Sequence, residues 1–290
     1  AAANITDDID LVVYTAAVHA DNPEYAEVVR RGIPMMSRAE LLGQIMKNYG
    51  EAIAISGTHG KTTTTSMVTE ILLAAEKDPT ISVGGILHSI GGNIRVGGPE
   101  LFVTEACEYT NSFLSFFPTM EIILNIEADH LDFFKDLDDI RHSFRLFAQK
   151  LDEKGLLIIN RDIKNYEEIS GGLPCRVVTF GHSSESDYSA ADITYDTFAR
   201  PTFNLMEQGK KAGTITLGVP GEHNVYNALA AIATAKALGI PDAAIADGLL
   251  HFTGTDRRFE KKGELNGITI IDDYAHHPQE IAATLKAAHN

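Results

Sequence analysis

A glycine-rich loop that contains one lysine and a run of threonines is the stretch of this chain best suited to chemistry. The sequence SGTHGKTTTT covers residues 56–65 and includes Gly57, Gly60, Lys61 and Thr62. Such a loop directs backbone N–H groups and a helix N-terminus into one concavity, which favours a polyphosphate because unpaired donors and the helix dipole both attract anions. Lys61 would reach the terminal phosphates, and the Thr62 hydroxyl would be offered to magnesium.

The glycine spacing departs from that of the common nucleotide-binding loop. In the common pattern the first glycine lies five residues before the second, and here Ile55 occupies that position. An alternative is that the two glycines only shape a strand-to-helix turn and that Lys61 is a solvated residue of the first helical turn. The order of apolar strand, Gly-Lys-Thr and helical spacing over residues 64–76 favours the phosphate site.

Two further candidates follow predicted strands. Glu105 ends the apolar run 101–104, and His130 comes soon after the predicted strand 121–126. Function in open α/β sheets collects at the carboxyl ends of the strands. A carboxylate beside a phosphate loop supplies the hard oxygen that magnesium prefers, so Glu105 is the candidate for a second magnesium contact and Glu108 is the alternative.

Both residues also have ordinary structural interpretations. Glu105 could be a solvated glutamate at a strand end. His130 could be a packed or capping histidine, because a single histidine is more often structural and imidazole is an unusual magnesium ligand.

Amides and guanidinium groups further along the chain could contact a nucleotide. Asn224 and Asn227 lie one turn apart on a predicted helix over residues 224–238, where their amides could read an adenine edge. Asn224 could equally cap the N-terminus of that helix. Arg258 could clamp a phosphate because its guanidinium group stays charged, and the adjacent Arg257 is the alternative.

Acidic and imidazole side chains crowd another predicted strand end, at Asp272, Asp273, His276 and His277. These residue types would suit a metal. Adjacent residues on a strand point to opposite sides, however, so contacts to substrate and ribose are favoured over metal ligation.

The elements that must position these residues alternate between apolar strand-like runs and helical patterns, which predicts an α/β fold with a mainly parallel central sheet. Residues 182–220 are predicted as an antiparallel excursion. The predicted strands are 11–14, 33–36, 52–55, 101–104, 121–126, 156–159, 176–180 and 268–271, and the predicted helices are 24–31, 38–48, 64–76, 224–238 and 242–250. Ser37 and Glu40 have the spacing of a capping box.

Composition excludes several classes of protein. The 290 residues carry a formal net charge of -16, which argues against nucleic acid as a partner because binding to a phosphate backbone needs a basic face. No run approaches the ~20 apolar residues of a membrane span. Two cysteines, Cys107 and Cys175, provide neither a disulfide framework nor a zinc site. These features predict a soluble cytoplasmic protein.

Six stretches, taken together and in their order, resemble the Mur ligases, the ATP-dependent amide-forming enzymes of peptidoglycan precursor synthesis. They are SGTHGKTTTT, EACEYTNSFL, NIEADHLD, GEHNVYNALAA, GTDRRFE and DDYAHHP. The resemblance extends over nearly the whole chain and includes the altered phosphate loop. It implies a nucleotide-binding central domain over residues 51–257, a partial Rossmann-like UDP-sugar domain over 1–50 and the start of a partial Rossmann-like amino-acid domain over 258–290.

The resemblance also implies a reaction. ATP and Mg²⁺ would activate the carboxylate of UDP-N-acetylmuramate as an acyl phosphate, from which the amine of L-alanine would displace phosphate. The loop would hold the phosphates, Asn224 and Asn227 would face the adenine, Arg258 the phosphates and Asp273 the ribose. His59 would lie on the sugar side, with Tyr274 and His276 on the L-alanine side.

The implied site residues fall into four overlapping groups. Nucleotide contacts are Gly57, Thr58, His59, Gly60, Lys61, Thr62, Thr63, Asn224, Asn227, Arg258 and Asp273. Magnesium ligands are Thr62, Glu105 and His130, substrate contacts are His59, Tyr274 and His276, and catalytic residues are Lys61, Glu105, His130 and Arg258.

Two departures from the family pattern bear on this prediction. Several sibling ligases use a carbamylated lysine in the helix after the metal histidine, but residues 140–148 contain Arg141 and Arg145 and no lysine. The chain also begins without methionine and ends inside a helical pattern, so we expect a fragment that folds around residues 51–257 and does not complete ligation alone.

Two alternative functions stay open. One is the related ligase that recycles a murein tripeptide onto the same nucleotide sugar, although EACEYTNSF and the stretch DNPE at 21–24 fit the alanine-joining enzyme better. The other is a non-catalytic nucleotide-binding regulator, which the presence of Glu105 and His130 disfavours.

Overall fold

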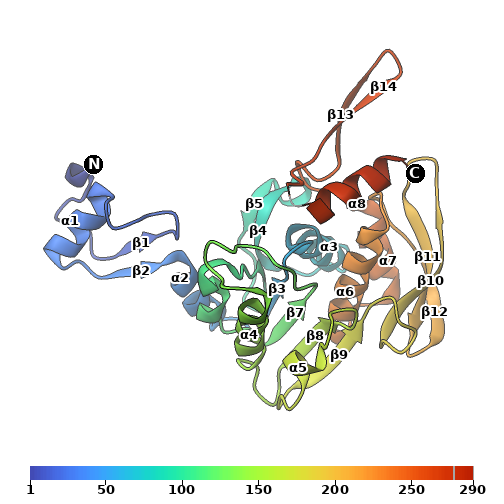
Figure 1. The fold of residues 1–290 in the computed structure, drawn as a ribbon, viewed down its shortest axis with the longest axis horizontal. Coiled ribbons are helices and arrows are strands. Elements are labelled where there is room, and N and C mark those ends of the chain that lie inside the picture. The colour runs from blue at the N-terminus through green and yellow to red at the C-terminus, as the bar shows by residue number, and fades with distance from the viewer. Residues whose placement is uncertain (277, 290) are drawn as a thin grey trace.

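The computed structural model, which describes residues 1–276 and 278–289, is organised around one ten-stranded sheet. Its strands are β3 (Glu51–Ser56), β4 (Thr80–Leu87), β5 (Gly92–Arg95), β6 (Leu101–Glu105), β7 (Met120–Ile123), β8 (Leu156–Asn160), β9 (Arg176–Phe180), β10 (Tyr188–Tyr195), β11 (Pro201–Glu207) and β12 (Lys210–Thr216). They lie in the order β12-β11-β10-β9-β8-β7-β3-β6-β4-β5 (Figure 1).

Parallel pairing runs through the middle of this sheet. Strands β4, β6, β3, β7, β8 and β9 are parallel, β10 joins β9 at one parallel residue pair, and β5, β11 and β12 add antiparallel edges. The predicted α/β class with a mainly parallel sheet is therefore confirmed, as is the antiparallel excursion after residue 182.

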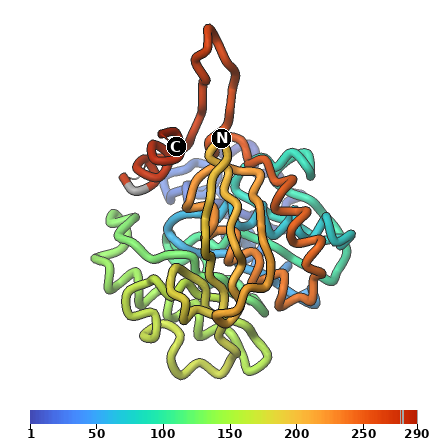
Figure 2. Tube along the Cα trace, turned by 90° about the vertical axis from the view of Figure 1, so that its right-hand side faces the viewer, coloured from blue at the N-terminus to red at the C-terminus, as the bar shows by residue number. Residues whose placement is uncertain are grey.

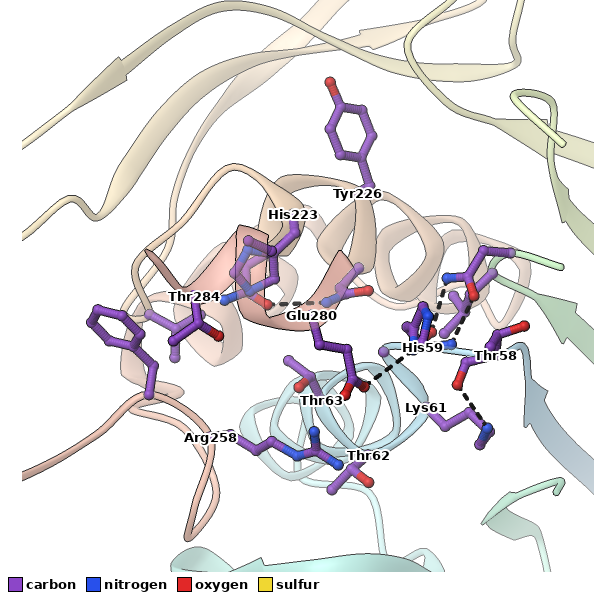
Figure 3. Close-up of a pocket in the computed structure, with 18 of the residues that line it drawn as sticks. Thr58, His59, Lys61, Thr62, Thr63, His223, Tyr226, Arg258, Glu280 and Thr284 are labelled. Carbon is purple, nitrogen blue, oxygen red and sulfur yellow. Dashed lines mark hydrogen bonds and ion pairs between the residues drawn. The ribbon is translucent and has the colours of Figure 1, made fainter. Parts of the chain in front are cut away.

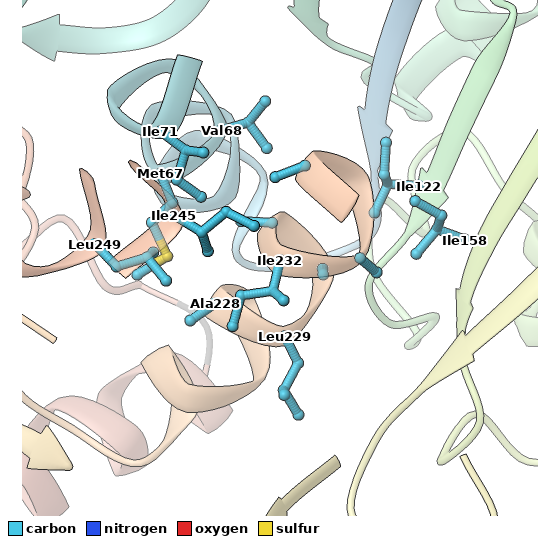
Figure 4. Packing of buried hydrophobic residues seen from close by; sticks show 14 of the residues in the cluster. Met67, Val68, Ile71, Ile122, Ile158, Ala228, Leu229, Ile232, Ile245 and Leu249 are labelled. Carbon is cyan, nitrogen blue, oxygen red and sulfur yellow. The ribbon is translucent and has the colours of Figure 1, made fainter. Parts of the chain in front are cut away.

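Helices cover both faces of the sheet because strand β3 is apolar on both sides. Ile53 and Ile55 face one core, and Ala52 and Ala54 face the other. The first core contains α3 (Lys61–Ala74), α6 (His223–Ala237) and α7 (Asp242–His251), packed as Figure 4 shows. The second contains α2 (Arg38–Met46), α4 (Leu137–Ala148) and α5 (Glu167–Ser170). Burial of both faces is typical of parallel sheets.

The two ends of the chain form small sheets of their own. Strands β1 (Val12–Tyr14) and β2 (Met35–Ser37) pair in parallel beside α1 (Pro23–Arg31), and Figure 1 shows this unit at one side of the central sheet. Strands β13 (Glu260–Leu265) and β14 (Ile268–Asp272) form a hairpin that projects from the body (Figure 2), followed by α8 (Pro278–His289). The predicted domain boundaries near residues 50 and 257 stay predictions.

Most predicted elements are present, with local corrections. The capping box of Ser37 and Glu40 is confirmed. Helix α3 begins at Lys61, three residues before the prediction, and β7 ends at Ile123 instead of residue 126. Strands β4, β5 and β13 were not predicted. The stretch from β4 to β5 contains four glycines, which weaken a strand pattern, and β13 is largely polar.

Two predictions from composition, on membrane-spanning segments and on the cysteines, can be compared with the described residues. No helix among them combines the length and apolar composition needed to cross a bilayer. Cys107 and Cys175 are both free thiols, as predicted.

One polar side chain lies within the second core without a described partner. Glu121 of β7 is fully buried, and neither carboxylate oxygen has a hydrogen-bond partner among the described residues. Desolvation raises the pKa of Glu121 well above its usual value, and the charge of Lys150 opposes this shift. The folded chain therefore retains a proton that the unfolded chain loses near pH 4.5, so this group lowers the free energy of unfolding as pH rises above that value.

We predict that Glu121→Leu stabilises the protein. Removal of a buried unpartnered carboxyl should raise the free energy of unfolding by about 1–3 kcal/mol, with a larger gain at pH 8 than at pH 5. Urea denaturation at both pH values measures the difference. The exposed Glu153, changed to Gln, serves as the control and should alter neither value. A variant that is equally or less stable at pH 8 would contradict the prediction.

Candidate active site

The loop between β3 and α3 requires glycine at two positions. Gly57 has φ 137°, and a Cβ atom there would lie 2.9 Å from Leu124 Cβ and 3.1 Å from the backbone nitrogen of Asn125. Gly60 has φ 86°, and its Cβ would lie 2.5 Å from Asn227 Oδ1. These backbone angles strain any residue with a side chain, so both predicted glycines are needed for the shape of the loop.

The segment after β7 holds the loop backbone. Asn125 Oδ1 accepts a hydrogen bond from the His59 N–H at 2.7 Å, while Asn125 Nδ2 donates to the His59 carbonyl at 2.9 Å. The Thr58 N–H donates to the Asn125 carbonyl, and the Glu127 N–H donates to Thr58 Oγ1. Residues 124–127 leave the strand ladder because they bind the loop in this way, which explains the early end of β7.

Helix α3 begins directly behind the loop and faces a large cavity. Gly60 is its N-cap, and no described side chain caps the helix N-terminus. Unpaired N–H groups of a first turn, together with the helix dipole, form a site for an anion. This geometry matches the predicted phosphate site.

The cavity gathers most of the predicted site residues. It has a volume of about 480 Å³, and Figure 3 shows residues that line it. The predicted residues on its wall are Thr58, His59, Gly60, Lys61, Thr62, Thr63, Glu105, His130, Asn224, Asn227, Arg258, Asp273 and His276. Segments more than 200 residues apart in the sequence therefore meet at the carboxyl edge of the parallel strands.

Two predicted residues are not on that wall. Gly57 is not among the lining residues, and its carbonyl accepts a hydrogen bond from Lys61 Nζ. Tyr274 is 55% exposed, and its ring lies near the guanidinium of Arg258, 5.6 Å away. Tyr274 therefore does not line this cavity, and its assignment to the substrate stays a prediction. His277 lies outside the described residues.

The structure separates the two adjacent arginines. Arg258 lines the cavity, whereas Arg257 is not among the lining residues and adopts a left-handed backbone conformation with φ 60°. Asp273 also lines the cavity, but its carboxylate accepts the N–H groups of Phe259 and Ala275, both at 2.7 Å. Asp273 therefore fixes the loop that carries Arg258.

The predicted magnesium ligands Thr62, Glu105 and His130 share the cavity wall. Glu105 accepts a hydrogen bond from the Gly84 N–H, and a Cβ at Gly85 would lie 3.2 Å from Thr62 Cγ2, so β4 packs against this side. Among the described residues no group of three or more His, Cys, Asp or Glu side chains forms a metal site. Magnesium commonly uses one or two carboxylates and completes its shell with phosphate oxygens and water, so the donors present fit an ion that arrives with a nucleotide.

His59 is held between two carboxylates. Its Nδ1 lies 3.1 Å from Glu280 Oε1, on α8, and its Nε2 lies 3.2 Å from Glu127 Oε2. Burial opposes the charge on the ring, but the hydrogen bonds to Glu127 and Glu280 prevail and raise the pKa of His59 to about 9. The imidazole of the loop is thus a cation at neutral pH.

Asn224 and Asn227 form a connected pair on α6. Asn227 Nδ2 donates to Asn224 Oδ1 at 3.0 Å, and Asn224 Nδ2 donates to the Pro220 carbonyl at 2.7 Å. Asn224 is not the N-cap, which is Glu222, so that alternative is wrong. Both amides are nearly buried and line the cavity, where a base edge would meet donors and acceptors together.

Sequence reasoning missed the far end of the cavity. Tyr226 and His182 stack there with ring centroids 3.7 Å apart, and His182 Nδ1 lies 2.6 Å from Asp162 Oδ2. Asp162 follows β8 and His182 follows β9, at the same sheet edge as Glu105. The sequence signal that could have identified Asp162 and His182 is that each one follows a parallel strand. Glu280 was missed for another reason, since only the fold brings α8 to the loop.

Models of known protein families match three parts of the chain. The Mur ligase middle domain matches residues 55–235, the Mur ligase glutamate ligase domain matches residues 257–290, and the Mur ligase catalytic domain matches residues 1–50. The chain belongs to the Mur ligase family. The expected family is therefore confirmed.

Named Mur ligases match this chain over nearly all of its length. UDP-N-acetylmuramate--L-alanine ligase from Lachnospira eligens is 66% identical over 288 residues, which are 99% of this chain and 63% of the relative. The enzyme of the same name from Agathobacter rectalis is 61% identical over 98% of this chain and 62% of its own length. The chain thus spans somewhat less than two thirds of these relatives.

Solved structures agree with the fold. The crystal structure of UDP-N-acetylmuramate-alanine ligase from Thermotoga maritima is 34% identical, covers 99% of this chain and 65% of its own, and superposes with a TM-score of 0.85. A murein peptide ligase from Psychrobacter arcticus is 27% identical, covers 96% of this chain and 63% of its own, and has a TM-score of 0.76.

We predict that Gly57→Ala strongly weakens nucleotide binding. The added Cβ meets Leu124 and the Asn125 backbone, so the loop must leave its position, and affinity for ADP should fall more than tenfold. Isothermal titration calorimetry measures the affinity. Gly172→Ala is the matched control, because Gly172 also has positive φ (69°) but nothing within 4 Å of the added atom. It should lose about 1 kcal/mol of stability and keep its affinity. Equal affinities for the two variants would contradict the prediction.

We also predict a titration midpoint near pH 9 for the His59 ring. The pKa of His59 is raised, so its contribution to stability is complete below pH 6.5 and is lost as pH rises through 9. NMR of the ring protons follows the titration. Glu280→Gln should lower the midpoint towards pH 6.5. Glu167→Gln, at an exposed position, should leave the midpoint unchanged. A midpoint near pH 6.5 in the unmodified protein would contradict the contacts of the His59 ring with Glu127 and Glu280.

Proposed function

We propose that the protein containing this chain is an ATP-dependent ligase that joins L-alanine to the carboxylate of UDP-N-acetylmuramate through an acyl phosphate, in the cytoplasm. The observation that carries the proposal is the position of Glu105, which lines two separate cavities. One is the cavity of the phosphate loop. The second has a volume of about 420 Å³ and lies between the N-terminal unit and the segment after β6.

The second cavity is suited to an anionic substrate. Residues from the end of β1 and from the start of α2, including Arg38, face residues that follow β6, including Cys107 and Thr110. A carboxylate in this cavity and a γ-phosphate in the first would approach each other beside Glu105. Reaction between two bound molecules requires such a shared wall, because proximity and orientation supply much of the rate enhancement.

The two reactants must approach each other against electrostatic repulsion. Both are anions and the chain carries a net charge of -16, so local cations must offset their repulsion. Lys61, Arg258 and the N-terminus of α3 face the first cavity and would bind the triphosphate. Thr62, Glu105 and His130 would hold Mg²⁺, which supplies further neutralisation of the phosphate oxygens when bound.

The remaining residues would orient the reactants. Asn224 and Asn227 would bind the base through their amides. The cavity wall formed by α8 and by Phe259 and Asp273, which flank the hairpin, would exclude water from the acyl phosphate. His59, a cation between two carboxylates, would position the loop. His276 lines the cavity on the α8 side, where the amine would enter.

L-alanine is favoured over a murein tripeptide as the acceptor. The named relatives with 66% and 61% identity are L-alanine ligases, whereas the murein peptide ligase structure is 27% identical. A non-catalytic regulator is disfavoured because the donors for both phosphate and magnesium line one cavity.

The test measures phosphate release by a protein that carries this chain and the remaining length of its relatives. With ATP, Mg²⁺ and UDP-N-acetylmuramate, we expect release to depend on L-alanine and to remain at background with the tripeptide. Lys61→Met should lower kcat at least a hundredfold, because it removes a cation that offsets developing charge. Release that is independent of any acceptor would overturn the proposal.

The adjacent arginines provide the matched control for that experiment. Arg258→Gln should raise KM for ATP and lower kcat, because Arg258 lines the cavity, whereas Arg257→Gln removes the same charge outside it and should retain near-normal activity. Equal losses in both variants would contradict a phosphate contact by Arg258.

A further inference from the structure

Glu108 is a buried acid that the proposed function does not use. Its exposed fraction is 2%, and it lines neither the cavity of the phosphate loop nor the second cavity. It follows the end of β6 by three residues. A carboxylate so deeply buried is costly unless it is paired with a cation, and the cation here is Lys61.

The ammonium of Lys61 has three protons, and each has an acceptor in the protein. Nζ donates to the Gly57 carbonyl at 2.5 Å, to the Thr58 carbonyl at 3.2 Å and to the carboxylate of Glu108, whose two oxygens lie 3.1 and 3.3 Å away. A phosphate that enters the loop must therefore displace at least one of these acceptors.

The three acceptors differ in strength. A hydrogen bond from an ammonium to a carboxylate involves charge on both sides and is stronger than one to a neutral carbonyl. A phosphate oxygen therefore replaces the Gly57 or Thr58 carbonyl as an acceptor more easily than it replaces the carboxylate of Glu108. The bond to Glu108 can persist and keep the ammonium at one point beside the cavity.

Glu108 is also near the histidine of the site. His130 Nε2 lies 3.9 Å from Glu108 Oε1, and the ring of Tyr109, the next residue, packs on the His130 ring with centroids 4.6 Å apart. The short segment Glu108-Tyr109 thus contacts both Lys61 and His130 from behind the cavity wall.

We propose that Glu108 is a positioning residue for phosphate binding, which fixes the ammonium of Lys61 through a buried charge-assisted hydrogen bond while the loop carbonyls are exchanged for phosphate oxygens. The proposal rests on the proposed function only in requiring that the first cavity binds a nucleoside triphosphate. It does not depend on the identity of the acceptor or of the sugar.

A double-mutant cycle tests this role. Isothermal titration calorimetry with a non-hydrolysable ATP analogue and Mg²⁺ is applied to the protein with the full length of its relatives and to its Glu108→Gln, Lys61→Met and doubly substituted forms. Glu108→Gln should weaken binding about tenfold in the presence of Lys61 and less than twofold in Lys61→Met, because Glu108 acts through Lys61. Adenosine, which lacks phosphate, should bind the unmodified protein and Glu108→Gln equally.

Two further variants distinguish positioning from a general structural role. Glu108→Asp retains the charge and should recover part of the lost affinity, while Gln at the exposed Glu167 removes one negative charge elsewhere and should change nothing. An equal loss from Glu108→Gln with and without Lys61 would overturn the proposal, as would an equal loss of adenosine binding. Failure of the unmodified protein to bind the analogue would instead refute the proposed function.

Discussion

The hydrogen bonds between Asn125 and the backbone of His59 are the interaction on which the rest of the site depends. They hold a loop with two positive-φ glycines against the end of the central sheet. Asn125 takes up the N–H groups of Thr58 and His59, and no described side chain caps the N–H groups of the first turn of α3. The anion site thus results from which donors are already paired and which are not.

Burial of both faces of β3 has a second consequence for the site. The strand cannot move relative to α3 and α6 on one side or α4 on the other without exposing apolar surface, so the loop that it carries has a fixed origin. The parallel order of β6, β3 and β7 then delivers Glu105, the loop and the segment 124–127 to the same edge. The candidate functional residues lie at this edge because the parallel register fixes where each of these strands ends.

The sequence was informative wherever a residue follows a recognisable strand. Glu105, His130 and the loop could be placed together because parallel strands deliver their carboxyl ends to one edge. It was less informative where the chain leaves regular structure. The apolar run that identifies β6 stops at Glu105, which favoured Glu105 over Glu108. The sequence could not show that Glu108 is buried outside the cavity and paired with Lys61.

Contacts between distant segments were also beyond the reach of sequence reasoning. The apolar pattern continues through residue 126. Only the contact with the loop shows that Asn125 binds backbone groups of the loop and is not part of the strand. Tyr274 and Arg258 lie in irregular segments whose direction depends on Asp273, which binds the N–H groups on either side of the hairpin. Such contacts join residues distant in sequence, and a single sequence has no local signal for them.

The ion pair of His59 with Glu280 joins the loop of the central sheet to a helix from the last part of the chain. A displacement of α8 away from the sheet would break this pair, while the ion pair between His59 and Glu127 would remain. The positions of α8 and of the loop are thereby coupled by one electrostatic interaction.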